Sequence, residues 1–207
     1  MTDREQLVGP LGLLNAVVLL FALLEALVFH RLDATVASLG RTRHWPSGGR
    51  DLVIVDKTGD RRWQQATQWA VARWNEAGAG VRLTWEAGRG PCRHEGVRIA
   101  VCQRTSTELR RQGPPRAEGL AKPQLDGESH ISGAIVLVCS DCSLDLSRRR
   151  VVATHEVGHV LGLSHSGDLG ALMSNHGGSE HPDRRAYAML RAIYDHEDRR
   201  EGAGPSR

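Results

Sequence analysis

The feature that most constrains this chain is the run HEVGHVLGLSH at residues 155–165. His155 and His159 are spaced so that, on an α-helix, both imidazoles project from one face about a turn apart. Gly162 permits a backbone conformation that other residues resist, so the helix can end there and the chain can turn sharply. Such a turn would bring His165 beside the other two rings. The run therefore predicts a helix, a tight turn and a cluster of three histidines.

The chemistry that suits this cluster is the binding of a zinc ion. Three neutral imidazoles leave the fourth tetrahedral position of Zn²⁺ open for water, which is typical of catalytic sites. Glu156 follows His155 around the helix and could reach that water without binding the metal. We predict that His155, His159 and His165 bind Zn²⁺ and that Glu156 is the catalytic base. The alternative is a helix with surface histidines, but a chance match at all five fixed residues of the run is rare.

Met173 provides a second, independent match to the same pattern. It lies in the sequence Ala171-Leu172-Met173, soon after the third histidine. A soft, unbranched side chain there can form an apolar floor under the histidines. A methionine in a turn is by itself more often plain core, so its weight comes from the zinc motif that precedes it.

Together these residues resemble the metzincin clan of zinc metalloproteases, and His165-Ser166 with Ala171-Leu172-Met173 is similar to matrixins, the matrix metalloproteinase family. The resemblance covers roughly residues 50–195. It implies hydrolysis of peptide bonds and an α+β fold: a twisted, mostly parallel five-stranded sheet with an antiparallel edge strand, an active-site helix, a Met-turn and a C-terminal helix. It also implies that substrate lies beside an edge strand at residues 117–121.

The chain departs from this family after the Met-turn. Ser174, Asn175 and His176 follow Met173, where matrixins usually have a proline and a tyrosine that shape the wall of the specificity pocket. The resemblance therefore does not predict which substrate side chains the specificity pocket prefers. Asn175 is also not the tyrosine by which astacin-like and serralysin-like relatives reach the metal, which argues against those branches. Two further histidines are expected at the surface and not on a metal: His94 and His130.

Residue patterns elsewhere predict alternating strands and helices. The expected strands are residues 51–56, 81–86, 96–102 and 131–139, and the expected helices are 61–77, 148–161 and a last helix opened by Pro182. Residues 103–129 are rich in Arg, Gly and Pro. We expect them to be mostly loop, with a brief edge strand at residues 119–121.

The chain is expected to divide into four parts: an apolar anchor or signal segment at residues 1–30, a linker at 31–50, a zinc metalloprotease domain at 51–197 and a charged tail at 198–207. Residues 7–29 are rich in Leu, Val and Phe, whose insertion free energies outweigh the cost of Glu25. We expect a retained membrane anchor. A cleaved signal peptide, with small residues at 34–37, and a buried soluble helix are the alternatives.

The side of the membrane on which the domain lies is open to two opposed arguments. Arg31, Arg41 and Arg43 follow within about fifteen residues of the apolar segment and only Arg4 precedes it, which by the positive-inside rule would keep the domain in the cytoplasm. Against this, an unregulated protease is hazardous in a cytoplasm, and cysteines that can pair suit an oxidising compartment. We expect a membrane-anchored protein with an extracytoplasmic catalytic domain. Secretion after signal cleavage is the alternative.

The four cysteines allow three pairings, and the sequence does not choose among them. One arrangement joins Cys92 to Cys102 and Cys139 to Cys142. A second metal site built from all four, or free thiols, are the alternatives.

Composition limits the partners. The formal net charge is +3, from 27 Lys and Arg against 24 Asp and Glu, and aromatic residues are 4% of the chain. A nucleic-acid site needs a concentrated basic face with stacking aromatics, so we expect none. The expected substrate is a peptide or protein, and the sequence does not predict the oligomeric state. The alternatives to a peptidase are a catalytically idle, membrane-tethered zinc-fold binding domain and a zinc hydrolase acting on non-peptide amides.

Overall fold

The computed structural model describes residues 43–127, 130–175 and 177–195. Its centre is a five-stranded sheet in the order β2-β1-β3-β5-β4. The strands are β1 (Asp51–Asp56), β2 (Arg82–Ala87), β3 (Arg98–Arg104), β4 (Gly119–Leu125) and β5 (Ile131–Cys139). Strands β2, β1, β3 and β5 are parallel, and only β4 runs antiparallel to its neighbour. The α+β fold class predicted from the sequence is confirmed.

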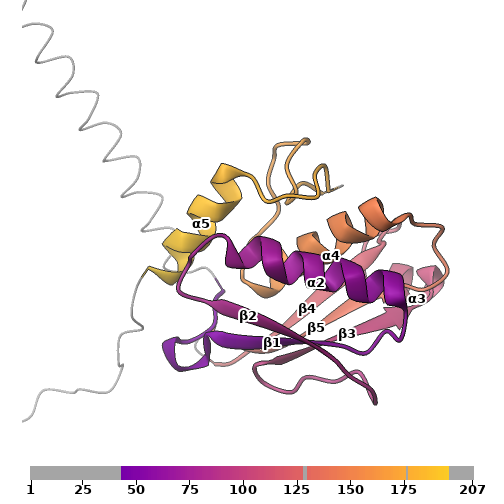
Figure 1. The fold of residues 1–207 in the computed structure, drawn as a ribbon, viewed down its shortest axis with the longest axis horizontal. Coiled ribbons are helices and arrows are strands. Elements are labelled where there is room, and N and C mark those ends of the chain that lie inside the picture. The colour runs from indigo at the N-terminus through magenta and orange to yellow at the C-terminus, as the bar shows by residue number, and fades with distance from the viewer. Residues whose placement is uncertain (1–42, 128–129, 176, 196–207) are drawn as a thin grey trace, which may run out of the picture. The chain divides into compact units, whose positions relative to one another are not determined.

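Two long helices cover one face of this sheet. Helix α2 (Arg61–Asn75) packs on β1 and β2, and helix α4 (Leu146–Val160) packs on β4 and β5. Figure 1 shows the two helices side by side above the strands, and they contact each other along their length. Helix α5 (Arg184–Tyr194) closes the described chain. Each of these three helices is preceded by an N-cap aspartate, whose side chain accepts hydrogen bonds from backbone amides of the first turn. The aspartates are Asp60, Asp145 and Asp183.

The opposite face carries a smaller apolar cluster under helix α3 (Ser106–Gln112). Leu109 of α3 is fully buried there against β3 and β5. Both disulfides join this cluster: Cys92–Cys102 and Cys139–Cys142. The structure thus has the one pairing that the sequence analysis had named among three.

The prediction for residues 103–129 was wrong in part. This region contains α3 and the full length of β4, in place of a loop with a three-residue strand. Helix α3 begins with a capping box, in which Thr105 accepts a bond from the Glu108 amide and Glu108 accepts one from the Thr105 amide. The Thr-Ser-Thr-Glu sequence is a recognisable start signal for a helix, although the Arg, Gly and Pro content around it favoured a loop.

A short segment before β1 crosses the C-terminal end of α4, and we call residues 43–45 the strap. Trp45 is 1% exposed, and its indole N–H donates to the Val160 carbonyl at 2.9 Å. The Ile131 amide donates to the His44 carbonyl at 2.7 Å. The Tyr194 hydroxyl donates to the Leu161 carbonyl at 3.1 Å. The last turn of α4 is therefore held from both ends of the described chain.

Among the described residues, no helix is long and apolar enough to cross a membrane. The expected anchor at residues 7–29 and the expected charged tail at 198–207 lie outside the described residues. Both therefore remain predictions.

Candidate active site

Helix α4 carries the site, and its buried carbonyl groups find side-chain partners on neighbouring elements. Trp74 of α2 donates its indole N–H to the Thr154 carbonyl at 2.8 Å, one residue before the first histidine. The helix ends where the sequence predicted a turn. Gly162 has φ +94°, and its amide donates to the backbone carbonyl of His159. The next amide, of Leu163, donates to the backbone carbonyl of Gly158. This Schellman arrangement reverses the chain direction and delivers the following loop to the helix face.

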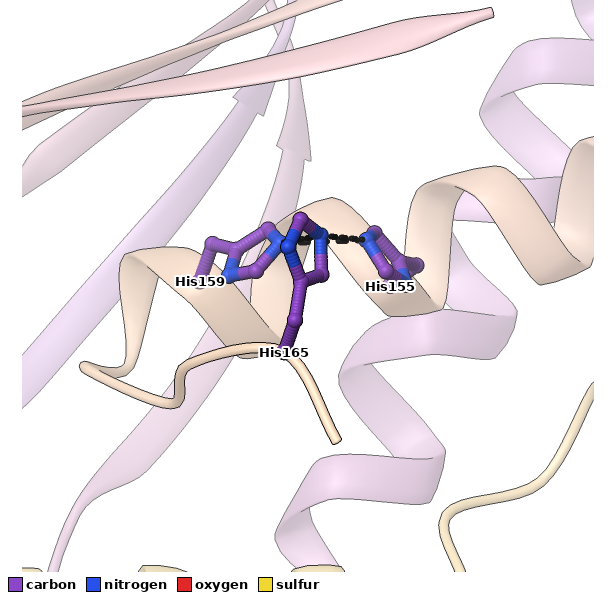
Figure 2. Close-up of side chains that lie close together, drawn as sticks. All are labelled: His155, His159 and His165. Atoms are coloured by element: carbon purple, nitrogen blue, oxygen red, sulfur yellow. Dashed lines mark hydrogen bonds between the residues drawn. The ribbon is translucent and has the colours of Figure 1, made fainter. Parts of the chain in front are cut away.

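The three predicted ligands converge. His155 and His159 come from α4 and His165 from the loop after it, and Figure 2 shows the three imidazoles turned toward one another. Their Nε2 atoms form a triangle with sides of 3.0 Å (155–159), 3.1 Å (159–165) and 3.2 Å (155–165). Tetrahedral zinc with Zn–N bonds of about 2.0–2.1 Å places its ligand nitrogens about 3.3–3.4 Å apart. The triangle therefore fits such an ion after small side-chain adjustments.

Backbone carbonyls fix the orientation of two of these rings. The Nδ1–H of His155 donates to the Leu172 carbonyl and that of His159 donates to the Leu163 carbonyl, both at 2.7 Å. With Nδ1 protonated, each neutral ring directs the lone pair of Nε2 at the centre of the triangle. Lone pairs that face one another repel unless a cation lies between them. The donor set therefore fits a divalent metal.

Burial keeps the two helix histidines neutral, which is the form that binds metal. Burial lowers the pKa of His159 to about 4, and the neighbouring His155 contributes. Burial also lowers the pKa of His155, although its bond to the Leu172 carbonyl acts in the opposite direction.

The carboxylate of Glu156 reaches the edge strand of the sheet. Its Oε2 atom accepts a hydrogen bond of 2.7 Å from the Ala121 amide of β4. Gly119 of the same strand makes room for the carboxylate, because a Cβ there would lie 2.8 Å from Glu156 Cγ and 2.9 Å from Oε1. Burial raises the pKa of Glu156 to about 8, and the Ala121 bond offsets only part of that rise.

Met173 lies under the histidines, where the sequence placed it. It is 3% exposed, and its sulfur packs against Gly158, which lies between His155 and His159 in sequence. The same turn supplies the Leu172 carbonyl that orients His155. The Met173 carbonyl accepts from the Ser166 amide at 2.6 Å, which ties the turn to the loop of the third histidine.

Several groups at the site could not be found from the residue pattern. They are backbone atoms or the space left by a missing side chain: the carbonyls of Leu163 and Leu172, the amide of Ala121, and the glycines Gly119 and Gly158. The resemblance to a known family did indicate the edge strand that contains Gly119 and Ala121.

One other group of metal-binding residue types occurs in the described part of the chain: Cys139, Asp141 and Cys142. Its two sulfurs form a disulfide and are not thiolate ligands. His94 is exposed and His130 half-buried, and neither belongs to a group of three potential ligands among the described residues.

Comparisons with known proteins identify the type of fold and the family. Archaemetzincin from Methanopyrus kandleri, a solved structure, superposes with a TM-score of 0.50 at 16% sequence identity, over 74% of this chain and 97% of that one. The fold is thus of the metzincin type. Residues 52–185 match the family model of matrixins, and the chain belongs to the matrixin family. Among curated proteins, none matches the sequence. The family is one of zinc-dependent peptidases, so zinc is the metal that family membership implies.

Proposed function

We propose that this protein is a zinc-dependent endopeptidase in which His155, His159 and His165 hold the metal and Glu156 is the catalytic base. The observation that carries the proposal is the triangle of Nε2 atoms with sides of 3.0–3.2 Å, next to a buried carboxylate at the open edge of the sheet. Family membership supports the reaction class.

The proposed mechanism assigns proton transfer to one residue. When bound, zinc would supply the Lewis acidity that lowers the pKa of an attacking water and polarises the scissile carbonyl. Glu156 takes a proton from the water while the oxygen of the water forms a bond to the carbonyl carbon. Glu156 then gives this proton to the nitrogen of the breaking C–N bond, so that an amine leaves. The carboxylate must be ionised to begin, and a nearby dication favours that form by lowering the raised pKa of Glu156.

The proposed substrate is an extended peptide segment that pairs with the outer edge of β4. Strand β4 is the last strand of the sheet, and Glu156 is bonded to it at Ala121. An added strand would therefore cross the site within reach of the base.

A pair of variants separates metal binding from chemistry. Glu156→Gln retains the shape of the side chain and should keep one zinc ion per chain, but it should lose peptidase activity by several orders of magnitude because it cannot accept the proton. His159→Ala should lose both zinc and activity, whereas His94→Ala, at an exposed histidine, should keep both. The measurements are metal content after dialysis and cleavage of casein. A Glu156→Gln enzyme near parental activity would contradict the proposed base.

The two rival functions give different results in the same assay. A catalytically idle binding domain would hold zinc and cleave nothing, and the presence of every ligand and of the base argues against it. A hydrolase of non-peptide amides would leave casein and gelatin intact while it hydrolyses small amides.

We also propose that the catalytic domain lies outside the cytoplasm, anchored by residues 7–29 or released after their cleavage. The two disulfides support an oxidising compartment. Protease treatment of intact cells should digest an anchored domain, with a cytoplasmic marker protein as the control. A domain that is degraded only after lysis would show that the arginines of the linker outweigh the disulfide argument.

A further inference from the structure

Strand β4 leaves one side without a strand partner in the described part of the chain. In an antiparallel pair, residues alternate between those that exchange backbone hydrogen bonds with the partner and those whose N–H and C=O point away from it. The outward groups of β4 are the ones that an added peptide strand would meet.

Two contacts fix this alternation. The Cys139 amide donates to the Glu118 carbonyl at 2.9 Å, so the position just before β4 faces β5. The Ala121 amide donates to Glu156, so Ala121 faces away from β5. Both contacts assign the outward positions to Gly119, Ala121 and Pro123, which occupy alternate places in the register.

The outward edge is poor in donors beyond Gly119. Pro123 has no N–H, and its place at an outward position is the one where a strand tolerates proline. The Ala121 amide is already bonded to Glu156 at 2.7 Å. Both residues keep carbonyls that can accept. At the two outward positions Ala121 and Pro123, the edge therefore offers a carbonyl acceptor but no N–H donor that a substrate could use.

We propose that this edge binds the substrate backbone on one side of the cleavage point only weakly, so that the enzyme accepts substrates with a short N-terminal flank. The inference rests on the proposed function, in which substrate pairs with β4. Antiparallel pairing is the more stable orientation. Because Glu156 is bonded to β4 at Ala121, the scissile bond would lie near Ala121. An antiparallel substrate then has its residues N-terminal to the scissile bond beside Pro123. The substrate carbonyl that faces Pro123 gains no hydrogen bond, so lengthening the peptide to that position adds little affinity.

The variant Pro123→Ala restores the missing donor. It should raise kcat/KM by about two- to tenfold, the worth of one net hydrogen bond, for a peptide long enough to reach residue 123. The same peptide truncated at its N-terminus should show no gain. A long peptide in which a methylene replaces the facing carbonyl should also show none. Gln124→Ala is the matched control, because the backbone groups of Gln124 face β5.

An equal gain for long and truncated peptides, or no gain for either, would overturn the inference. The same comparison by calorimetry uses peptides that end in a C-terminal hydroxamate, a zinc-chelating group, with and without the N-terminal extension. In that assay Pro123→Ala should tighten binding of the extended peptide alone by the same factor. A protein that shows this binding difference but cleaves no peptide would contradict the proposed function and leave the edge inference standing.

Discussion

At Gly158 the helix that carries the histidines has no room for a side chain. A Cβ at this position would lie 2.6 Å from the sulfur of Met173 and 2.8 Å from Cζ2 of Trp74. The glycine therefore lets the Met-turn and α2 approach the helix between His155 and His159. A glycine inside a helix is otherwise unfavourable by about 1 kcal/mol relative to alanine.

Gly158→Ala should destabilise the fold by about 1–3 kcal/mol, because overpacking outweighs the gain in helix propensity. The measurement is urea-induced unfolding followed by circular dichroism. Gly48→Ala is the control, since a Cβ there meets nothing within 4 Å, and its effect should stay within about 0.5 kcal/mol. A Gly158→Ala protein as stable as its parent would show that Met173 can move aside at no cost.

The cluster of three histidines could be predicted from sequence, but the groups that orient the rings could not. His155, His159 and His165 are particular residue types at a particular spacing, which a pattern can capture. Their partners at Leu163 and Leu172 act through carbonyl oxygens, which every residue possesses. Only the folded chain shows which carbonyl is in reach.

At the scale of elements, Asp60 joins the two helices that lie over the sheet. One carboxylate oxygen caps α2 by accepting from the Arg62 and Trp63 amides, and the other accepts from Arg149 of α4 at 3.1 Å. The Arg149 guanidinium also lies over the Trp63 ring, 4.8 Å from its centroid. Burial acts to raise the pKa of Asp60, but the two amides and Arg149 together lower it below its usual value.

Asp60→Asn keeps a cap acceptor but loses the charge, so it should destabilise the protein by about 1 kcal/mol at neutral pH. Because the folded-state pKa of Asp60 is lowered, this contribution is present above the unfolded-state pKa of about 3.9 and is lost as pH falls through the folded-state value. The gap between parent and variant should therefore close below about pH 4. Unfolding free energies between pH 3 and 7 test this.

Asp51→Asn is the control for that series. Asp51 also pairs with an arginine, Arg82, but the two side chains are 88% and 76% exposed. An exposed pair contributes about 0–1 kcal/mol, so this variant should show little change at any pH. If both variants lost the same free energy of unfolding, the Asp60–Arg149 ion pair between α2 and α4 would add no stability beyond that of the helix cap.

Element prediction succeeded where one signal dominated and failed where signals conflicted. The β-branched run of β5 and the capped, amphipathic α2 were confirmed. Helix α3 was missed because it is short and lies among arginines, glycines and prolines, and its stability comes from Leu109 in the second apolar cluster. That tertiary contact has no counterpart in local sequence.

At the scale of the whole molecule, both disulfides stabilise the face of the sheet opposite α2 and α4. The Cys92–Cys102 bridge spans a sequence separation of 10, against 3 for Cys139–Cys142. In the chain-entropy account, the longer loop gives the larger effect, about 3 kcal/mol for a loop of this length.

Replacing both Cys92 and Cys102 by alanine should therefore lower the Tm by about 6–12 °C for a domain of roughly 150 residues. Differential scanning calorimetry with and without a reducing agent provides the comparison. The variant should lose less than the parent on reduction, because only its second bridge remains to be broken. If reduction lowered the Tm of both proteins equally, the first bridge would contribute nothing.

The topology of the sheet followed from the family resemblance, but the extent of the packed structure did not. Residues 31–50 read as a linker because of their glycine, proline and arginine content. Trp45, within that range, is among the largest fully buried side chains of the described chain. A single tryptophan surrounded by loop residues carries no periodicity, so its docking site on α4 and α5 was invisible in the sequence.

The strap also determines where a mechanical load would enter the fold. The Arg43 carbonyl lies so close to Gly162 that a Cβ there would be 2.0 Å from it, and Trp45 is bonded to the carbonyl just before that turn. Tension on the chain ahead of Arg43 would be carried to the last turn of α4 and, through the His44–Ile131 bond, to the first residue of β5. Peeling the strap away would expose the Gly162 turn and loosen Leu163, the partner of His159. In an optical trap, a pull through this end should release zinc from the proposed ligands at a lower force than unfolds the rest of the sheet.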